Sequence, residues 1–481
     1  MTGTQVSRTK SPTVWLDVTG IVRWGAQPPT GIQRVETVIC KHGMEIGTVG
    51  FVAFDGVIGK YRRLSRMDRA FLDFIIKGKW ATETGGYWAR LRSAFAFLPV
   101  QFNYQDNETS RRLAHAVTGF RGRSGPAYVF AKTVIRLIQW SYLLGRFFVL
   151  GARRLLAALG IGVASTTFDD GGVLLVSHEV NNHGSISTAL SASGLAGVNI
   201  VHDLIPVLMP QLTSSRFTRR MDSFFRRILD EPEPIIAVSE ATRDDLLSWN
   251  RDVVGAAYPY RVKVCPLGSA LVSTEGDNDP IPGLSGRRFA VFCSTFDIRK
   301  NQHLLVAAWA WLARNIPVEK LPDLVLIGRR GNATPLVEAE LEKAPELAGR
   351  VHILSGISDR QLRWAYRNAH LGLFPSSAEG WGLGVSECMA NGLPVVHADV
   401  PALKEAAQKL MPVLPAGDFD AWAATLKDLF EHPEKIDALR DLVAERYDHG
   451  TPEGFAGCVI SYLQALADTG LEAARKDGGQ A

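Results

Sequence analysis

Two series of short apolar segments constrain the fold of this chain more than any other feature. Each segment has the length of a buried strand, and residues typical of a loop or helix follow it. The first series comprises residues 14–18, 47–54, 173–177, 197–201, 234–239 and 261–264, and the second comprises residues 289–293, 323–328, 350–354, 371–374, 394–398 and 410–414. Strands that alternate with helices predict parallel, doubly wound α/β sheets.

A segment rich in glycine, proline, aspartate and asparagine separates the two series at residues 273–284. This composition is typical of a linker, and the 481 residues of the chain suffice for two or three domains. We therefore predict a Rossmann-like domain over residues 1–270, with a helical, basic and apolar insertion at about 60–165. We expect a second such domain over residues 285–450, and a helical segment over 451–481 that is a candidate to pack back on the first.

The second series contains a glycine-rich loop between a strand and a helix. The strand 371–374 ends at Pro375, glycines stand at every second position from Gly380 to Gly384, and helical residues follow as far as Asn391. Backbone N–H groups and the positive end of the helix dipole favour a phosphate at such a position. Glycine also allows a ligand to approach the backbone closely.

Two carboxylates, Glu379 and Glu387, flank this loop. Carboxylates repel phosphate but accept hydrogen bonds from hydroxyl groups. The pattern therefore predicts a ligand with phosphate in its middle and hydroxyls at both ends, as in a sugar nucleotide. The alternative is an ordinary turn in which the glycines serve packing and the glutamates complement the helix dipole.

Basic and small polar residues follow other strands, at the edge where open α/β sheets bind ligands. Arg299 and Lys300 open a helix after the strand 289–293, where two cations can neutralise a diphosphate. His202 follows the strand 197–201, and Gly31 and Arg34 lie in a helix after the first strand. The alternatives are a structural histidine at 202 and a surface arginine at 34.

Composition excludes few classes of protein. The net charge of +4 is small for this length, so no nucleic-acid partner is expected. The five cysteines are odd in number and scattered without a CxxC pair, which predicts reduced, cytoplasmic cysteines and no structural zinc. Residues 1–12 lack the apolar segment of a signal peptide.

Residues 128–159, within the insertion, are rich in aliphatic and aromatic side chains. The polar residues Lys132, Gln139, Arg146 and Arg153 recur every seven positions, with Arg136 close to the same helical face. This pattern predicts a helix with a wide apolar surface and a narrow basic stripe. Such a helix can lie on an anionic membrane surface, or it can pack on its own domain or on a second subunit.

The residues described above resemble retaining glycosyltransferases of the GT-B fold, in glycosyltransferase family 4, over most of residues 14–35 and 172–470. The strongest match runs from Glu379 to Glu387 and fits the family's E-x7-E signature. Supporting matches occur in order at residues 30–34, 201–206, 238–240, 266–268, 299–301 and 394–396, with Glu405 downstream. The resemblance implies two Rossmann-like domains that face each other across a cleft, with the acceptor on the N-terminal side and the sugar nucleotide on the C-terminal side.

The resemblance also implies roles for the matching residues. Glu379 would contact the sugar hydroxyls of the donor, Glu387 would hold the ribose hydroxyls, and Lys300 with Arg299 would stabilise the diphosphate. His202 would line the reacting face in the N-terminal domain, which gives an implied catalytic set of His202, Lys300 and Glu379. The implied donor-binding residues are Gly31, Arg299, Lys300, Glu379, Gly380, Trp381, Gly382, Leu383, Gly384 and Glu387.

The sequence departs from the family at Thr295. Many members carry an arginine five residues before the lysine, so that here diphosphate neutralisation would rest on Lys300 and Arg299.

By resemblance, we expect a retaining hexosyltransferase that moves a sugar from a nucleotide-sugar donor, with GDP-mannose as the first candidate. The acceptor would be a saccharide or a lipid-linked saccharide in surface polysaccharide synthesis. We expect no metal and no cofactor, and a cytoplasmic location peripheral to the inner face of the membrane. The alternatives are a GT-B sugar-nucleotide epimerase or phosphorylase, and a non-catalytic sugar-nucleotide-binding scaffold.

Overall fold

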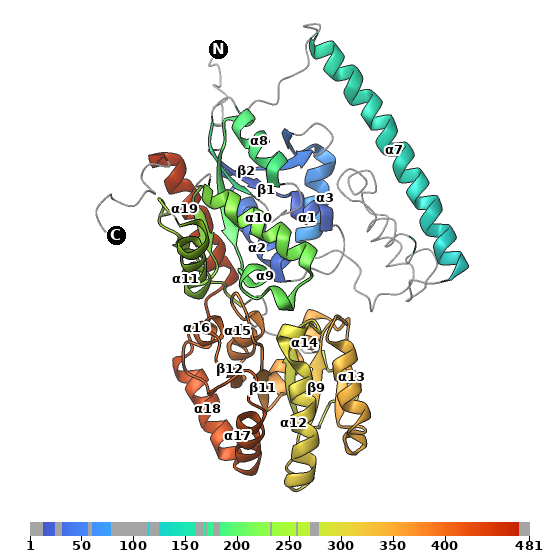
Figure 1. The fold of residues 1–481 in the computed structure, drawn as a ribbon, viewed down its shortest axis with the longest axis vertical. Helices are drawn as coiled ribbons and strands as arrows, with labels where there is room; N and C mark the ends of the chain where they lie inside the picture. Colours follow the sequence, from blue (N-terminus) through green and yellow to red (C-terminus); the bar gives the residue numbers. More distant parts are fainter. Residues whose placement is uncertain are drawn as a thin grey trace, which may run out of the picture.

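The computed structural model describes residues 13–24, 31–55, 60–77, 114, 125–158, 168, 171–176, 183–230, 233–255, 258–269 and 279–470. It contains two α/β domains, each built on its own sheet, and the chain passes from one to the other after residue 269 (Figure 1). Both sheets are predominantly parallel, as the alternation of strands and helices predicts.

The N-terminal sheet has seven strands in the order β3-β2-β1-β4-β5-β6-β7. Only the edge pair β2 and β3 is antiparallel among these described strands. The strands are β1 (Val14–Asp17), β2 (Val49–Asp55), β3 (Lys60–Arg63), β4 (Val173–Val176), β5 (Ala196–Val201), β6 (Ile235–Ala237) and β7 (Lys263–Val264). Strands β1 and β4 are buried at every position, as expected for strands covered by helices on both faces.

The C-terminal sheet has six parallel strands in the order β10-β9-β8-β11-β12-β13. They are β8 (Phe289–Cys293), β9 (Asp323–Ile327), β10 (Val351–Leu354), β11 (Leu371–Phe374), β12 (Val395–Ala398) and β13 (Val413–Leu414). This order reverses direction between β8 and β11, and the N-terminal order does so between β1 and β4. Ligands of open α/β sheets bind at such switch points, outside the carboxyl ends of the strands.

Helices connect the strands of each sheet. In the N-terminal half they are α1 (Thr19–Trp24), α2 (Gly31–Ile46), α3 (Arg66–Ile76), α7 (Pro126–Ala158), α8 (His183–Ser193), α9 (Ile205–Leu208), η2 (Pro210–Leu212), α10 (Ser215–Asp230), α11 (Glu240–Trp249) and η3 (Asn250–Val254). In the C-terminal half they are η4 (Ile298–Lys300), α12 (Gln302–Asn315), α13 (Thr334–Glu342), η5 (Pro345–Leu347), α14 (Asp359–Asn368), α15 (Leu383–Ala390), α16 (Pro401–Ala406), α17 (Phe419–Glu431), α18 (Pro433–Arg446) and α19 (Pro452–Thr469).

The start of the expected helical insertion belongs instead to the N-terminal sheet, because β3 pairs with β2. Strand β3 and helix α3 lie within residues 60–77, and the rest of the expected insertion lies mostly outside the described residues. A capping box begins α3, because the Ser65 hydroxyl accepts from the Asp68 N–H and the Asp68 carboxylate accepts from the Ser65 N–H. Arg62 of β3 also pairs with Asp68 at 2.6 Å.

Helix α19 returns to the N-terminal domain and packs against α2, β1 and β4 (Figure 1). Its residues Phe455, Val459, Ile460 and Leu463 belong to the same buried core as the N-terminal strands. The chain thus crosses between the domains twice, once after β7 and once before α19.

The two crossings lie against each other. The Ser269 N–H donates to the Gly450 carbonyl at 3.0 Å, and a Cβ at Gly268 would lie 2.3 Å from the Thr451 carbonyl carbon. A disulfide joins Cys265 to Cys458 beside this contact. The expectation that all cysteines are reduced is therefore wrong for this pair, because the return of α19 brings together two residues that are 193 positions apart in the sequence.

We expect Gly268→Ala to destabilise the protein, because the backbone of the other crossing occupies the space of the new methyl group. Overpacking against a backbone that cannot move aside should cost about 2 kcal/mol in the free energy of unfolding. Denaturant unfolding measures this loss. The matched control is Gly457→Ala in α19, whose new Cβ would meet its nearest neighbour only at 3.7 Å and should leave stability equal or raised by about 0.5–1 kcal/mol. Equal midpoints for Gly268→Ala and the wild type would contradict the tight crossing.

Candidate functional site

The glycine-rich loop follows β11, at the point where the C-terminal strand order reverses. Residues 375–382 connect β11 to α15, and β11 pairs with both β8 and β12. Residues after β8 lie on the same edge, since the two strands are parallel. This arrangement brings Arg299 and Lys300, in η4, to the glycine-rich loop.

Glu379 is the centre of a buried ionic cluster. Its carboxylate accepts from the Lys300 ammonium group, and its second oxygen lies 3.0 Å from Arg299 Nη1. Arg299 Nη1 also donates to the Ala378 carbonyl at 3.0 Å. The side chains of Lys300 and Glu379 are only 11% and 10% exposed, so the cluster is largely removed from water.

The electrostatics of this cluster favour the charged form of Glu379. Burial acts to raise the pKa of Glu379, but the charges of Lys300 and Arg299 outweigh it and lower the pKa to about 2. Burial lowers the pKa of Lys300, and Glu379 offsets part of that effect. The site therefore holds a carboxylate and two cations close together in a low-dielectric environment, which makes it suited to bind a ligand that carries both hydroxyl groups and negative charge.

Glu387 lies just past the first turn of α15 and is buried. Its carboxylate accepts from the Tyr366 hydroxyl at 3.1 Å and lies 3.5 Å from Arg34 Nη1 of the other domain. Burial raises the pKa of Glu387 to about 6, although Arg34 and Tyr366 act to lower it. Tyr366, in α14, was missed in the sequence, where nothing local links it to the glycine loop.

Each glycine of the loop has a steric reason. A Cβ at Gly380 would lie 1.9 Å from the His202 carbonyl oxygen, and one at Gly384 would lie 2.4 Å from the Phe374 ring. Gly382 has a φ of +106°, which favours glycine. These glycines therefore serve packing within the protein, as the alternative interpretation of the loop expected. At Gly380 the close approach is between the two domains.

Hydrogen bonds across the domain junction reinforce that approach. The Gly380 carbonyl accepts from the hydroxyls of Ser239 at 2.6 Å and Thr242 at 3.1 Å. The Glu405 carboxylate accepts from the N–H groups of Glu240 and Ala241, at 2.9 and 3.1 Å, at the N-terminus of α11. Glu405 of the C-terminal domain therefore caps a helix of the N-terminal domain.

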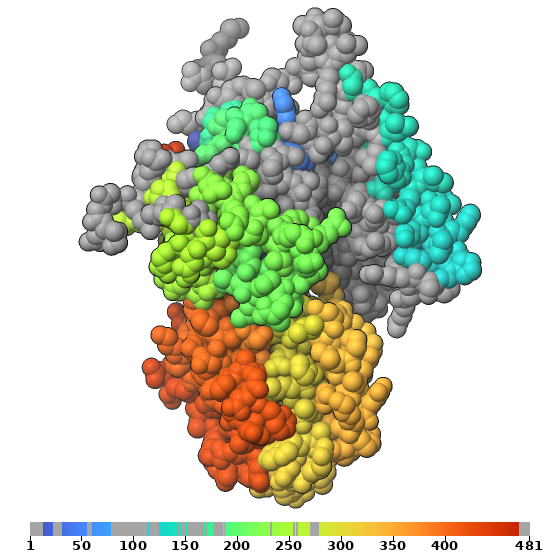
Figure 2. Space-filling model, in the orientation of Figure 1, coloured from blue at the N-terminus to red at the C-terminus, as the bar shows by residue number. Residues whose placement is uncertain are grey.

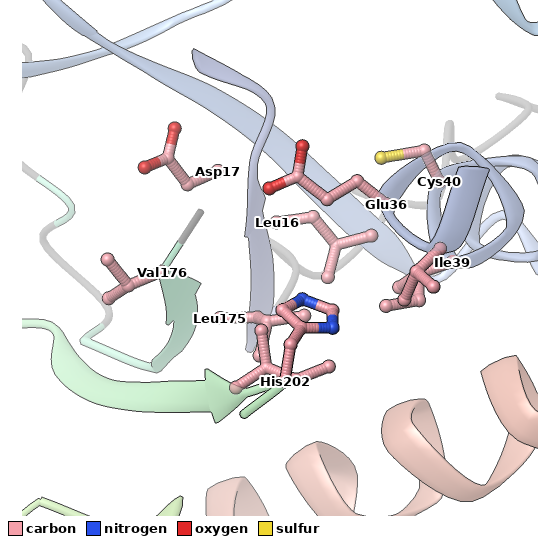
Figure 3. A pocket seen from close by; sticks show the side chains of 10 residues that line it. Leu16, Asp17, Glu36, Ile39, Cys40, Leu175, Val176 and His202 are labelled. Carbon is pink, nitrogen blue, oxygen red and sulfur yellow. The ribbon is translucent and has the colours of Figure 1, made fainter. Parts of the chain in front are cut away.

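The N-terminal domain has a small pocket of about 20 Å³ at its own switch point (Figure 3). Residues at the ends of β1, β4 and β5 line it together with α2, and the His202 imidazole points into it with Glu36 and Cys40 on the opposite side. Asp17 also lines the pocket, but its carboxylate already accepts from Thr19 and Tyr61. His202 connects the pocket to the junction, because its carbonyl accepts from Thr242 at 3.2 Å.

The structure brings the predicted site residues to one region between the domains. Arg299, Lys300 and Glu379 form the ionic cluster, and the loop residues lie against His202. A Cβ at Gly31 would lie 3.4 Å from Leu383, and Trp381 packs against both domain cores. Within the described residues, no three His, Cys, Asp or Glu side chains are grouped as metal ligands.

Comparison with known proteins identifies the C-terminal domain. Residues 287–432 match the family described as "Glycosyl transferases group 1". The chain is 28% identical over 232 residues to the serotype-specific mannosyltransferase WbdA of Escherichia coli, which covers 46% of this chain and 28% of the relative. It is 24% identical over 233 residues to O-antigen chain mannosyltransferase B of the same species, covering 47% and 59%. The match therefore spans less than two thirds of either relative.

Solved structures agree on the fold. Anabaena Alr3699/HepE, solved in complex with UDP and glucose, superposes with a TM-score of 0.52 at 14% identity, over 96% of this chain and 99% of that one. The α,α-trehalose 6-phosphate synthase of Burkholderia multivorans gives the same score and identity over 71% and 78%. The protein has the GT-B fold, and residues 287–432 form a group 1 glycosyltransferase domain homologous to bacterial O-antigen mannosyltransferases.

We expect Lys300→Met to lower the free energy of unfolding by about 2 kcal/mol, because it leaves the buried Glu379 with only one cationic partner. The double variant Lys300→Met with Glu379→Gln should regain part of that loss, since it removes the unpaired charge. Denaturant unfolding at neutral pH measures both. Lys343→Met is the matched control, because its pair with Glu340 is exposed and should contribute almost nothing. If Lys300→Met unfolded at the same denaturant concentration as the wild type, the ion pair between Lys300 and Glu379 would not contribute to stability as described.

Proposed function

We propose that this glycosyltransferase moves a hexose, with mannose from GDP-mannose as the first candidate, onto a saccharide or lipid-linked saccharide acceptor in surface polysaccharide synthesis. The observation that carries the proposal is the buried cluster of Glu379, Lys300 and Arg299 at the switch point of a group 1 glycosyltransferase domain. The printed names of the O-antigen mannosyltransferase relatives support mannose as the sugar.

On this proposal, Lys300 and Arg299 face the donor diphosphate and Glu379 accepts hydrogen bonds from the sugar hydroxyls. Negative charge builds on the departing phosphate as the sugar–phosphate bond breaks. Two cations already fixed by Glu379 stabilise that charge without reorganising, and most of their effect appears in the transition state. Glu387 then holds the ribose hydroxyls at the other end of the donor.

The acceptor enters from the N-terminal side, where His202 lines the pocket at the carboxyl ends of β1, β4 and β5. The family resemblance implies retention of configuration. Because Lys300 and Arg299 already hold the Glu379 carboxylate, we propose attack from the face that the leaving phosphate occupies rather than through a covalent intermediate. The contacts of Gly380 and Glu405 across the junction support closure of the domains during transfer, which keeps water from the donor. No residue is assigned to a metal or cofactor.

A sugar-nucleotide epimerase or phosphorylase of the same fold, or a non-catalytic scaffold, would use the donor site differently. Transfer releases free nucleoside diphosphate only when acceptor is present. An epimerase needs no saccharide acceptor, and a scaffold binds without turnover. A phosphorylase needs inorganic phosphate and releases a sugar phosphate. Product analysis with and without acceptor or phosphate therefore separates the transferase from the other three.

We expect nucleoside diphosphates to raise the melting temperature by mass action, with GDP the most effective.

With the selected sugar donor and acceptor, Glu379→Gln should lower turnover by about 10²–10³-fold, because a preorganised polar contact to the reacting sugar is lost. Nucleoside diphosphate release measures the rate. The matched control, Glu338→Gln, removes an exposed carboxylate of the same domain and should keep wild-type turnover. If UDP were the most effective nucleotide, the proposed donor would change to a UDP-sugar. No response to any nucleotide would overturn the proposed function.

We further propose that helix α7 binds an anionic membrane surface. Several of its large apolar side chains are 57–72% exposed: Phe130, Leu137, Trp140, Leu144 and Phe148. Figure 2 shows the helix along an outer edge of the molecule. The opposite side, with Tyr128, Ile135 and Gln139, is buried. None of the helices that the structure describes has the length and apolar character to cross a bilayer.

Charge favours a lipid surface over a second copy of this chain as the partner of α7. Residues 126–158 contain five basic residues and no Asp or Glu: Lys132, Arg136, Arg146, Arg153 and Arg154. Lys132 and Arg136 are only partly buried, so their cations flank the exposed apolar side chains, and this arrangement stabilises a helix at the boundary of anionic headgroups. Two copies of the helix would instead bring like charges together. On this proposal the protein works in the cytoplasm, against the inner face of the membrane.

We expect the wild-type protein to sediment with vesicles of phosphatidylcholine and phosphatidylglycerol and much less with phosphatidylcholine alone. The triple variant Phe130→Ser, Leu137→Ser and Trp140→Ser should bind at least about tenfold more weakly, because it removes three exposed apolar side chains. The control Val318→Ser with Leu336→Ser removes exposed apolar side chains of the other domain and should bind normally. Failure of the wild type to bind any vesicle would contradict the proposal, and a dimer in gel filtration would then identify α7 as a subunit interface.

A further inference from the structure

Arg34 reaches across the domain junction. It lies in the second turn of α2, in the N-terminal domain, and its guanidinium contacts two carboxylates of the C-terminal domain. Nη2 lies 2.6 Å from Asp359 Oδ1, and Nη1 lies 3.5 Å from Glu387 Oε1. Asp359 is largely exposed, whereas the Glu387 side chain is only 7% exposed. Arg34 thus connects the surface to a buried carboxylate, and the alternative of a surface arginine without a partner is wrong.

The groups that face Glu387 come from several elements. Tyr366 of α14 donates a hydrogen bond to it, Asp359 of α14 adds a negative charge, and Cys293 of β8 and Cys388 of α15 are close and neutral. Arg34 is the one cation among the described groups that act on it. Burial raises the pKa of Glu387 to about 6, which is close to neutral pH. Arg34, which belongs to the other domain, acts to lower this pKa and so favours the charged carboxylate.

We propose that Arg34 is a positioning residue that makes the hold of Glu387 on the donor ribose depend on closure of the two domains. The inference rests on the proposed function, which assigns the ribose hydroxyls to Glu387. A charged carboxylate accepts both hydroxyls, whereas a protonated one gives up part of its accepting capacity. With the domains closed, Arg34 keeps Glu387 in the charged form. When they separate, Glu387 loses its cation and holds the nucleotide less tightly.

Coupling of this kind works in both directions. If closure strengthens ribose binding, then ribose binding favours closure by the same factor. Donor binding therefore promotes the state in which Gly380 meets His202 and water is excluded. Opening after transfer weakens the hold on the nucleoside diphosphate and assists its release. Arg34 acts only through Glu387 and needs no contact with the substrate.

The test measures nucleoside diphosphate affinity by calorimetry between about pH 5.5 and about pH 8.5, a range that includes the Glu387 pKa. Wild-type affinity should fall as the pH drops through about 6. In Arg34→Gln, the midpoint of that fall should move upward by about one pH unit, because an opposite charge has been removed. Affinity at the highest pH should remain close to that of the wild type. Arg34→Lys keeps the charge and should restore most of the wild-type midpoint.

Two controls separate this mechanism from a structural role. Lys41→Gln removes a cation from the same helix, at an exposed pair with Glu453, and should leave the pH profile unchanged. Glu387→Gln should bind more weakly, and its affinity should show only the pH dependence that comes from the terminal phosphate of the ligand, which titrates at about pH 6 with every variant. Thermal unfolding without ligand checks that each variant folds.

The possible outcomes distinguish the coupling from the function on which it rests. A midpoint in Arg34→Gln equal to that of the wild type overturns the coupling and leaves the role of Glu387 intact. Tighter binding by Arg34→Gln also overturns it, since Arg34 would then compete with the ribose. A loss of affinity that is the same at every pH would assign Arg34 to the phosphates instead. An unchanged profile in Glu387→Gln overturns the ribose assignment itself, and the coupling with it.

Discussion

The close approach of Gly380 to the His202 carbonyl is the contact on which the arrangement of the site depends. No side chain fits between them, since a Cβ at Gly380 would lie 1.9 Å from that oxygen. Ser239 and Thr242 then reach the Gly380 carbonyl, and Glu405 reaches the N-terminus of α11. These contacts set how closely the two domains approach each other in the closed arrangement. Arg34 and the ionic cluster lie along the same junction.

Buried charge is the cost of placing a site at this junction. Glu379, Lys300 and Arg299 are taken out of water together, and such clusters contribute little net stability compared with apolar residues of similar volume. Their value lies in fixed orientation, since a preorganised charge needs no rearrangement when a substrate arrives. Glu387 is different, because Tyr366 and Arg34 only partly offset its burial. Two carboxylates in one site therefore have pKa values shifted in opposite directions, because two cations lower the pKa of Glu379 and burial raises that of Glu387.

Local sequence was sufficient for the elements and for the residues of the ionic cluster. Strand β11 begins and ends where its apolar run does, and α7 differs from the expected helix only at its ends. The glycines and Glu379 could be located because a strand, a loop and a helix follow one another directly in the chain. The partners of Glu387 could not, since Tyr366 and Arg34 come from other elements and share no local pattern with it. The disulfide between Cys265 and Cys458 was missed for the same reason, because it depends on the path of α19.

That path also bears on how the domains can move. Helix α19 belongs to the core of the N-terminal domain, while α17 and α18, which precede it, pack on the C-terminal one. Both chain crossings therefore lie at one place, and Gly268, Ser269 and Gly450 hold them in contact. Two adjacent crossings restrict sliding of one domain over the other but allow rotation about the line that they define. The contact of Arg34 with Glu387 is made by α2 and α15 and not by the crossing segments, and opening would break it. The residues that anchor the hinge and the residues that sense closure are thus separate, and each set can change without disturbing the other.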